Sequence, residues 1–177
     1  MARTRSFRKR RCRTVTQQTA VQWTHHDVNV PIARFLKSRL SQRKLAFYVL
    51  RIRFNGSPAT KIGITDAVLS KRLSDHRDKP HYADIHVHSV HTLDGVNGAD
   101  YTFHDVVRRT ETLLWRTLRN RGLLLLPEVP GKRTLKTKDV VREHEVVSRS
   151  NEASALRVLR ELMCAAATQT AVAMVRS

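Results

Sequence analysis

The stretch 47–76 constrains the fold of this chain more than any other, because strand, turn and helix signals follow one another directly in it. Residues 46–54, AFYVLRIRF, alternate apolar and basic side chains toward their end, as strands do, and Asn55-Gly56 is a strong turn signal. A return strand is expected over 60–64 and a short helix over 68–76. A hairpin followed by a helix predicts an antiparallel sheet with helices packed against it, which is the α+β class.

Apolar periodicity predicts further elements on both sides of this hairpin. Thr65 and Asp66 are expected to cap the helix that follows the return strand. Gly122 fits the residue just past the end of a helix, where the left-handed conformation is common. The other expected elements are a leading helix over 31–44, a strand over 83–93, a loop over 94–100, a long helix over 102–121, a strand over 140–148 and a last helix from Asn151 to about Met174.

The charge is the strongest global signal. The 33 Lys and Arg residues outnumber the 15 Asp and Glu residues, which gives a formal net charge of +18 and an isoelectric point near 11.3. This excess predicts a polyanionic partner, nucleic acid before a membrane surface. A basic soluble protein without such a partner is the alternative. No apolar run approaches the roughly 20 residues that a membrane-spanning helix needs, so no membrane partner is expected.

The N-terminus is the most basic part of the chain. Residues 1–13 hold seven Arg or Lys residues and no acid, and the first acid of the chain is Asp27. We interpret 1–30 as a basic arm, followed by one domain over 31–148 and a C-terminal helix over 149–177. A nuclear-type signal in RKRRCR and an Arg-rich organellar presequence are the alternatives for the arm. The residues expected to contact nucleic acid are Arg3, Arg5, Arg8, Lys9, Arg10, Arg11, Arg13 and, in the predicted helix, Lys71.

Cysteine and histidine usage predicts neither a disulfide nor a metal site. Cys12 and Cys164 lie far apart and flank no ligand pair, so an intracellular, reducing compartment is expected. This would be the cytoplasm, the nucleus or the inside of a virus particle, with an organelle left open. The histidines in and beside the strand over 83–93 are interpreted as a solvated or nucleic-acid-facing surface, because no neighbouring Cys or Asp completes a metal site. They are His81, His86, His88 and His91.

A single acid stands within the apolar stripe of the long predicted helix. Glu111 falls between Val107 and Leu114, and a carboxylate on a buried face costs free energy unless a cation or a hydrogen-bond donor meets it. A surface salt bridge with Arg108 or Arg116 is the alternative. The residues expected to form the stripe are Val106, Val107, Thr110, Leu113, Leu114 and Leu118.

The chain carries the residue types that phosphodiester cleavage requires. A base must take a proton from the attacking water, and cations must steady the phosphate and the departing oxygen. Tyr48 or His76 has the chemistry for the first task, and the forked guanidinium of Arg72 suits the phosphate. Glu111 is suited to hold one Mg²⁺ or Mn²⁺ through oxygen contacts, with water completing the shell.

In their order along the chain, these residues resemble the GIY-YIG nuclease superfamily, in the phage- and bacteria-type branch whose second motif reads K-I-G followed by Thr. The first motif is matched by 46–50, AFYVL, and the second by Lys61-Ile62-Gly63. The R-L-x-x-H helix motif is matched by 72–76 and the E-x-x-L motif by 111–114. The resemblance implies a small three-stranded antiparallel sheet flanked by helices.

The resemblance also implies a mechanism with one divalent ion, Mg²⁺ or Mn²⁺. Tyr48 would help to deprotonate water, Arg72 would steady the phosphate, and Glu111 would be the metal ligand. An acid begins the closing strand of this branch, and Glu143 and Glu145 are both candidates for it.

The second tyrosine of the family is replaced here by Lys61, so its role would fall to Lys61, His76 or Tyr82. The expected function is hydrolysis of DNA by a metal-dependent endonuclease, with low sequence specificity and a basic arm that raises affinity through phosphate contacts. One alternative is a non-catalytic nucleic-acid-binding component of a large assembly, a virus particle or an organellar ribosome. Another is a repair or homing-type enzyme.

Overall fold

The computed structural model describes residues 22–94, 101–125 and 146–176. The basic residues expected to contact nucleic acid from the N-terminus lie outside these ranges, as do Cys12, most of the loop expected over 94–100 and both acids proposed for the closing strand. They are Arg3, Arg5, Arg8, Lys9, Arg10, Arg11, Arg13, Cys12, Glu143 and Glu145. The described elements are β1 (Gln22–Pro31), α1 (Ile32–Phe35), β2 (Ala46–Phe54), β3 (Ser57–Thr65), α2 (Leu69–Arg77), β4 (Tyr82–Asp94), α3 (Tyr101–Asn120), β5 (Val146–Ser148) and α5 (Glu152–Arg176), with short 3₁₀ turns at Arg39–Gln42 and Arg149–Asn151.

The α+β class is confirmed, but the expectation of three strands is wrong. The sheet has five strands in the order β1-β4-β2-β3-β5, and every neighbouring pair is antiparallel. The β2–β3 hairpin and β4 form its centre, as the sequence predicted. β1 adds to the free edge of β4, and β5 adds to β3.

The prediction of a basic arm over residues 1–30 is wrong for 22–30, which belong to β1. The sequence does not predict this strand, because QWTHHDVNVP is polar and the strand lies at an edge of the sheet, where His25, Asp27, Asn29 and Pro31 are exposed. Its pairing with β4 is interrupted between Asp27 and Val30, where Asn29 takes a positive φ of 47°. Such a bulge breaks the regular alternation by which strands are recognised.

The leading helix expected over 31–44 is also wrong, because only Ile32–Phe35 is α-helical. Ser38 is extended, and its hydroxyl accepts a hydrogen bond from the backbone N–H of Ser41. A serine that caps locally in this way competes with the helix, so the chain restarts as the 3₁₀ turn Arg39–Gln42.

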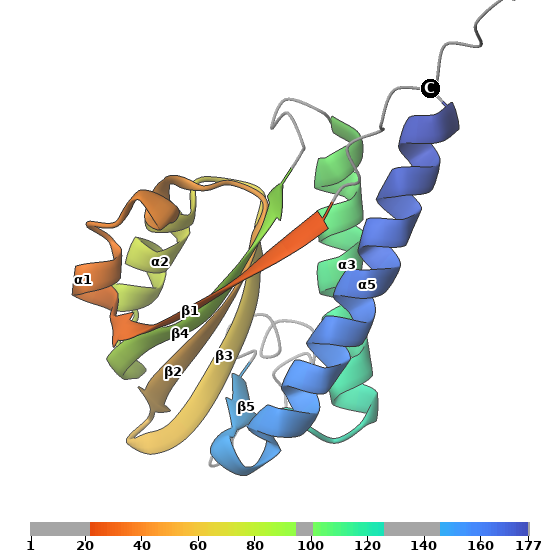
Figure 1. Ribbon diagram of the computed structural model, residues 1–177. Helices are drawn as coiled ribbons and strands as arrows, with labels where there is room; N and C mark the ends of the chain where they lie inside the picture. Colours follow the sequence, from red (N-terminus) through yellow and green to blue (C-terminus); the bar gives the residue numbers. More distant parts are fainter. Residues whose placement is uncertain (1–21, 95–100, 126–145, 177) are drawn as a thin grey trace, which may run out of the picture.

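The two faces of the sheet are covered by different helices (Figure 1). α1 and α2 lie on one face, and α3 and α5 lie on the other. Because side chains of a strand alternate between faces, Tyr48 and Leu50 of β2 pack in the cluster under α2, whereas Phe47 and Val49 pack in the cluster under α3 and α5. β2 is therefore buried on both sides.

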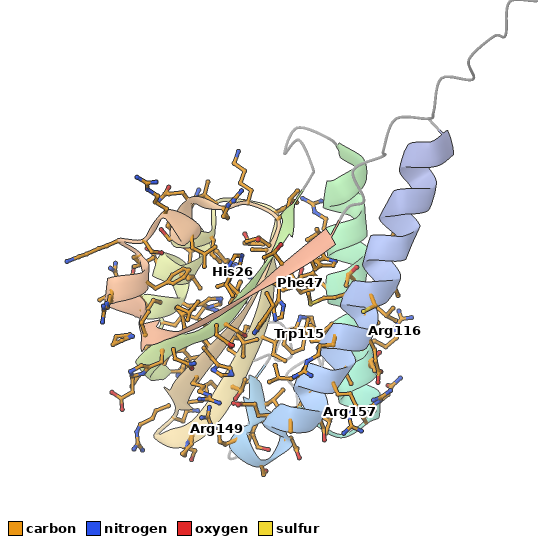
Figure 2. All side chains as sticks on the ribbon, viewed as in Figure 1. His26, Phe47, Trp115, Arg116, Arg149 and Arg157 are labelled. Carbon is orange, nitrogen blue, oxygen red and sulfur yellow. The ribbon has the colours of Figure 1, made fainter. Side chains whose placement is uncertain are left out.

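The second helical layer is amphipathic, as its sequence predicted. Phe47 of β2 and Trp115 of α3 lie between the sheet and the helices, while Arg116 and Arg157 point away from the sheet (Figure 2). Leu113 was expected in the buried stripe of α3, but it is 46% exposed. It lies about 100° around the helix from the buried Leu114. The buried face of α3 is therefore narrower than the apolar stripe that the sequence predicted. None of the described helices is long and apolar enough to cross a membrane.

Candidate functional site

The centre of the candidate site is Tyr48, which the hairpin places directly opposite Gly63. The Tyr48 ring lies across the position where any other residue would carry its Cβ. A Cβ on Gly63 would come within 2.2 Å of both Cζ and the hydroxyl oxygen of Tyr48. The glycine of the Lys61-Ile62-Gly63 motif is therefore required by close packing rather than by an unusual backbone angle.

Tyr48 and His76 form a buried pair. The phenol oxygen of Tyr48 lies 2.6 Å from Nε2 of His76, and the two residues are 0% and 1% exposed. Burial raises the pKa of the Tyr48 phenol above its usual value, and the charge and hydrogen bond of Arg72 oppose the rise. Burial, followed by the charges of Lys61, Arg72 and Lys79, lowers the pKa of His76 to about 3. At neutral pH the pair therefore holds a protonated phenol and an uncharged imidazole.

The imidazole has one further free position within the described part of the chain. Nδ1 of His76 is buried and has no hydrogen-bond partner among the described residues. When the phenol donates its hydrogen to Nε2, the proton of the neutral ring sits on Nδ1. This arrangement leaves Nε2 as the acceptor of the Tyr48 proton.

Arg72 connects this buried pair to the surface. It lies one turn before His76 on α2, so that both side chains leave the same side of the helix. Although burial works to lower the pKa of Arg72, the Tyr48 phenol and then the Glu111 and Asp75 carboxylates raise it overall. The guanidinium is thus a permanent cation that the phenol and the acids stabilise.

The surface end of the site is a hollow of about 300 Å³ at the end of β3. β5 pairs only with 59–61 of β3, and the later part of β3 carries no pairing among the described strands on that side. α2 and α3, which cover opposite faces of the sheet, both contribute residues to this hollow. The lining residues are Ile64, Thr65, Asp66, Ala67, Lys71, Arg72, Asp75, Val107, Arg108 and Glu111.

Glu111 reaches the hollow from α3 and is half-buried there. Arg108 is one of the two alternative salt-bridge partners of Glu111. Its guanidinium nitrogen Nη2 lies 3.5 Å from Oδ2 of Asp66. Arg116 points to solvent. Glu111 and Arg72 line the same hollow, and the charge of the Glu111 carboxylate raises the pKa of both Arg72 and Tyr48.

The expected cap of α2 is not formed. The helix begins at Leu69 after Val68, and no side chain caps it. Thr65 instead closes the turn before the helix, since its hydroxyl accepts from the N–H of Ala67 at 3.1 Å and donates to the carbonyl of Ala67 at 3.2 Å. Asp66 lines the hollow.

Lys61 and Tyr82, two of the candidates to take the role of the family's second tyrosine, are more deeply buried than Arg72 and Glu111. Lys61 is 4% exposed, and its Nζ lies 4.7 Å from the centroid of the Trp115 ring, a cation–π contact. Tyr82 is 7% exposed, with its ring centroid 5.8 Å from that of His76. Neither residue lines the hollow, whereas Lys71 is exposed at its rim.

The hollow presents oxygen donors of the kind that Mg²⁺ and Mn²⁺ prefer. Two acids that the sequence did not assign to the site, Asp66 and Asp75, join Glu111 in its lining. Within the described ranges, no group of three or more His, Cys, Asp or Glu side chains is arranged to hold a metal ion. An ion held by Glu111 would therefore keep most of its shell as water, which suits Mg²⁺. Asp75 could have been predicted from the sequence, because it lies three residues after Arg72 on the same helix and residues at that spacing are neighbours.

The comparisons with known proteins leave this site to be judged on its geometry. No family model, no curated protein and no solved structure matches the chain.

Proposed function

We propose that this protein is a GIY-YIG-like endonuclease that hydrolyses phosphodiester bonds of DNA with one divalent ion, Mg²⁺ or Mn²⁺. The observation that carries the proposal is the meeting of Tyr48, Arg72, His76 and Glu111. They come from β2, α2 and α3 and span more than sixty positions of sequence, yet they converge at one edge of the sheet.

The residues divide the chemistry as follows. The phosphate docks on the Arg72 guanidinium, which lines the hollow and stays charged at any working pH. Glu111 would hold the divalent ion, which would supply Lewis-acid stabilisation of the phosphate and of the departing oxygen. Water attacks phosphorus from the hollow. Tyr48 is fully buried and lies outside the lining of the hollow, so the water's proton would reach its phenol only as substrate binding opens this contact, and the phenol would give its own proton to Nε2 of His76.

Substrate binding itself makes His76 a better base. Lys61, Arg72 and Lys79 each lower the pKa of His76 by their positive charge. A phosphate bound to Arg72 would offset part of this charge and so raise the pKa of His76, whereas the larger lowering by burial would remain.

The net charge of +18 supports nucleic acid as the partner. Lys71 and Arg108 at the rim of the hollow would contact phosphates beside the cleaved bond, and the basic N-terminus would add further contacts. Affinity should then fall steeply as salt is raised, because each phosphate contact releases counterions.

The test is nicking of supercoiled plasmid at low salt with Mg²⁺ or Mn²⁺, using the full chain. Glu111→Gln, Arg72→Ala and Tyr48→Phe should each lower the nicking rate about 100-fold or more. The matched controls are Glu161→Gln and Arg77→Ala, exposed residues on α5 and α2 whose pairs with Arg121 and Asp78 lie away from the hollow. Both controls should nick at the wild-type rate.

Retained folding of each variant, checked by circular dichroism, separates loss of chemistry from loss of structure. DNA binding without metal-dependent nicking, unchanged by Glu111→Gln, would refute the enzyme. It would leave the domain as a nucleic-acid-binding component of a larger assembly.

A further inference from the structure

A second cluster of polar side chains lies away from the Tyr48 site, on the face of the sheet that α5 covers. His25 of β1 and His91 of β4 are direct cross-strand partners. Their Nδ1 atoms lie 3.3 Å apart, and their ring centroids are 4.5 Å apart. His91 is 8% exposed, whereas the His25 side chain is 51% exposed and open to solvent.

Asp27 determines which nitrogen of His25 faces its partner. Nε2 of His25 lies 3.1 Å from Oδ1 of Asp27. A carboxylate accepts only, so Nε2 carries the hydrogen and Nδ1 of the neutral ring keeps its lone pair. Nδ1 of His25 lies 3.3 Å from Nδ1 of His91. Two such nitrogens at 3.3 Å need a proton or a cation between them.

The spacing of the two nitrogens also fits a shared cation. Zinc binds imidazole nitrogen at about 2.0–2.1 Å in tetrahedral geometry, which places two such nitrogens about 3.3–3.4 Å apart. The arrangement of carboxylate, imidazole and then an open coordination position is the one by which proteins orient metal-binding histidines. Both histidine positions are held by the β1–β4 ladder, so the pair is pre-organised.

The pair opens onto a cavity of about 710 Å³ between the sheet and α5. The cavity gives a cation and its water ligands both access and room. Other polar groups in its wall are His88, Ser89, Arg160 and Cys164. His88 is engaged elsewhere, because its Nδ1 lies 2.6 Å from Oδ1 of Asn29. Among the described residues that line the cavity, His25 and His91 are therefore the candidate ligands.

We propose that His25 and His91 form a two-histidine site for a zinc-type divalent cation, with Asp27 orienting His25 and water completing the coordination. Imidazole selects Zn²⁺, Ni²⁺ and Cu²⁺ over Mg²⁺, so this site and the oxygen-lined hollow at Glu111 take different ions. The cation links the edge strand β1 to β4. Its role is to fasten the edge of the sheet.

The experiment is zinc titration of the full chain carrying Cys12→Ser, Cys164→Ser and Glu111→Gln, which removes both thiols and the acid of the nuclease site. Calorimetry should give one bound zinc. Further substitution of His25→Ala or His91→Ala should abolish this binding, and Asp27→Asn should weaken it about tenfold. His86→Ala, which removes an exposed histidine of β4, is the matched control and should bind as the parent does.

Histidine nitrogen NMR identifies the ligands directly. Zinc should shift the Nδ1 resonances of His25 and His91 and leave those of His86 in place. It should also raise the melting temperature of the parent but not of the His25→Ala variant. Zinc binding that survives both alanine substitutions, or Nδ1 resonances that do not respond to zinc, would overturn the proposal. The pair would then be a histidine–histidine hydrogen bond only.

Discussion

Replacing Gly63 with alanine introduces a methyl group where the Tyr48 ring now lies. The new Cβ would stand 2.2 Å from the Cζ and hydroxyl oxygen of Tyr48 and 2.5 Å from Cε2. To reach an ordinary contact of 3.4 Å from 2.2 Å, the ring must retreat by about 1.2 Å. Tyr48 is 0% exposed and has no empty space to enter, so the strain spreads to its neighbours.

The cost follows from two effects that add and one that opposes them. Overpacking of a filled core costs about 1–3 kcal/mol. A ring displaced by this amount loses the 2.6 Å hydrogen bond to His76, worth about 1 kcal/mol. The change from glycine to alanine in a strand returns about 0.5–1 kcal/mol of backbone entropy. We expect Gly63→Ala to lower the free energy of unfolding by about 2–3 kcal/mol.

Urea unfolding of a double-mutant cycle with Tyr48→Leu isolates the clash from other effects of the alanine. Leucine lacks the ring atoms that the new Cβ would meet. In that background Gly63→Ala should therefore be neutral or stabilising, so the coupling energy should be about 2–3 kcal/mol. An equal cost of Gly63→Ala in both backgrounds would refute the packing explanation of this glycine.

Three further predictions concern the core, the anchoring of α5 and the response to pH. Leu114→Ala should lower the free energy of unfolding by about 2–5 kcal/mol because Leu114 is 0% exposed, whereas Leu113→Ala, at a residue 46% exposed, should cost under about 1 kcal/mol in urea unfolding. Glu152→Ala should lower the free energy of unfolding by about 2–4 kcal/mol, because the carboxylate accepts a hydrogen bond from Thr60 and lies 2.8 Å from both Arg51 and Arg149. Glu161→Ala is the control and should lower it by under about 1 kcal/mol, because the exposed pair of Glu161 with Arg121 spans 3.6 Å. The pKa of His76 falls from 6.5 to about 3 on folding, so the unfolded chain binds the proton more tightly and stability falls as pH drops from about 6.5 toward 3. In urea unfolding, the free energy of unfolding of the wild type should fall by about 2 kcal/mol more between pH 7 and pH 5 than that of His76→Gln. Equal losses in the two proteins would show that another group causes the pH dependence.

Local patterns predicted the centre of the fold well. β2, the turn at Asn55-Gly56, β3 and β4 stand where alternation and turn residues placed them, because these signals act between neighbours in sequence. The long helix α3 ends before Gly122, which takes the expected positive φ of 63°. The same reasoning failed at Ser38, where one side-chain hydrogen bond outweighed an apolar period.

The candidate site was predictable as a set of residues but not as an arrangement. The spacing of Arg72 and His76 on one helix could be read directly, since residues four apart share a face. That Tyr48 lies under Arg72, and that Glu111 meets both from a helix on the other side of the sheet, depends on where β3 ends. The motif predicted Lys61 beside these residues, and the structure buries it with its Nζ over the Trp115 ring while its charge still acts on His76.

The sequence by itself determined the hairpin, the class of the fold, the basic character of the surface and the residue types of the candidate site. Each depends on composition or on contacts between residues a few positions apart. The tertiary structure alone decided the five-stranded sheet and the meeting of His25 with His91, sixty-six positions away. Edge strands such as β1 are stabilised by pairing with a strand that is distant in sequence. A polar sequence with a bulge lacks the regular alternation from which such a strand could be predicted.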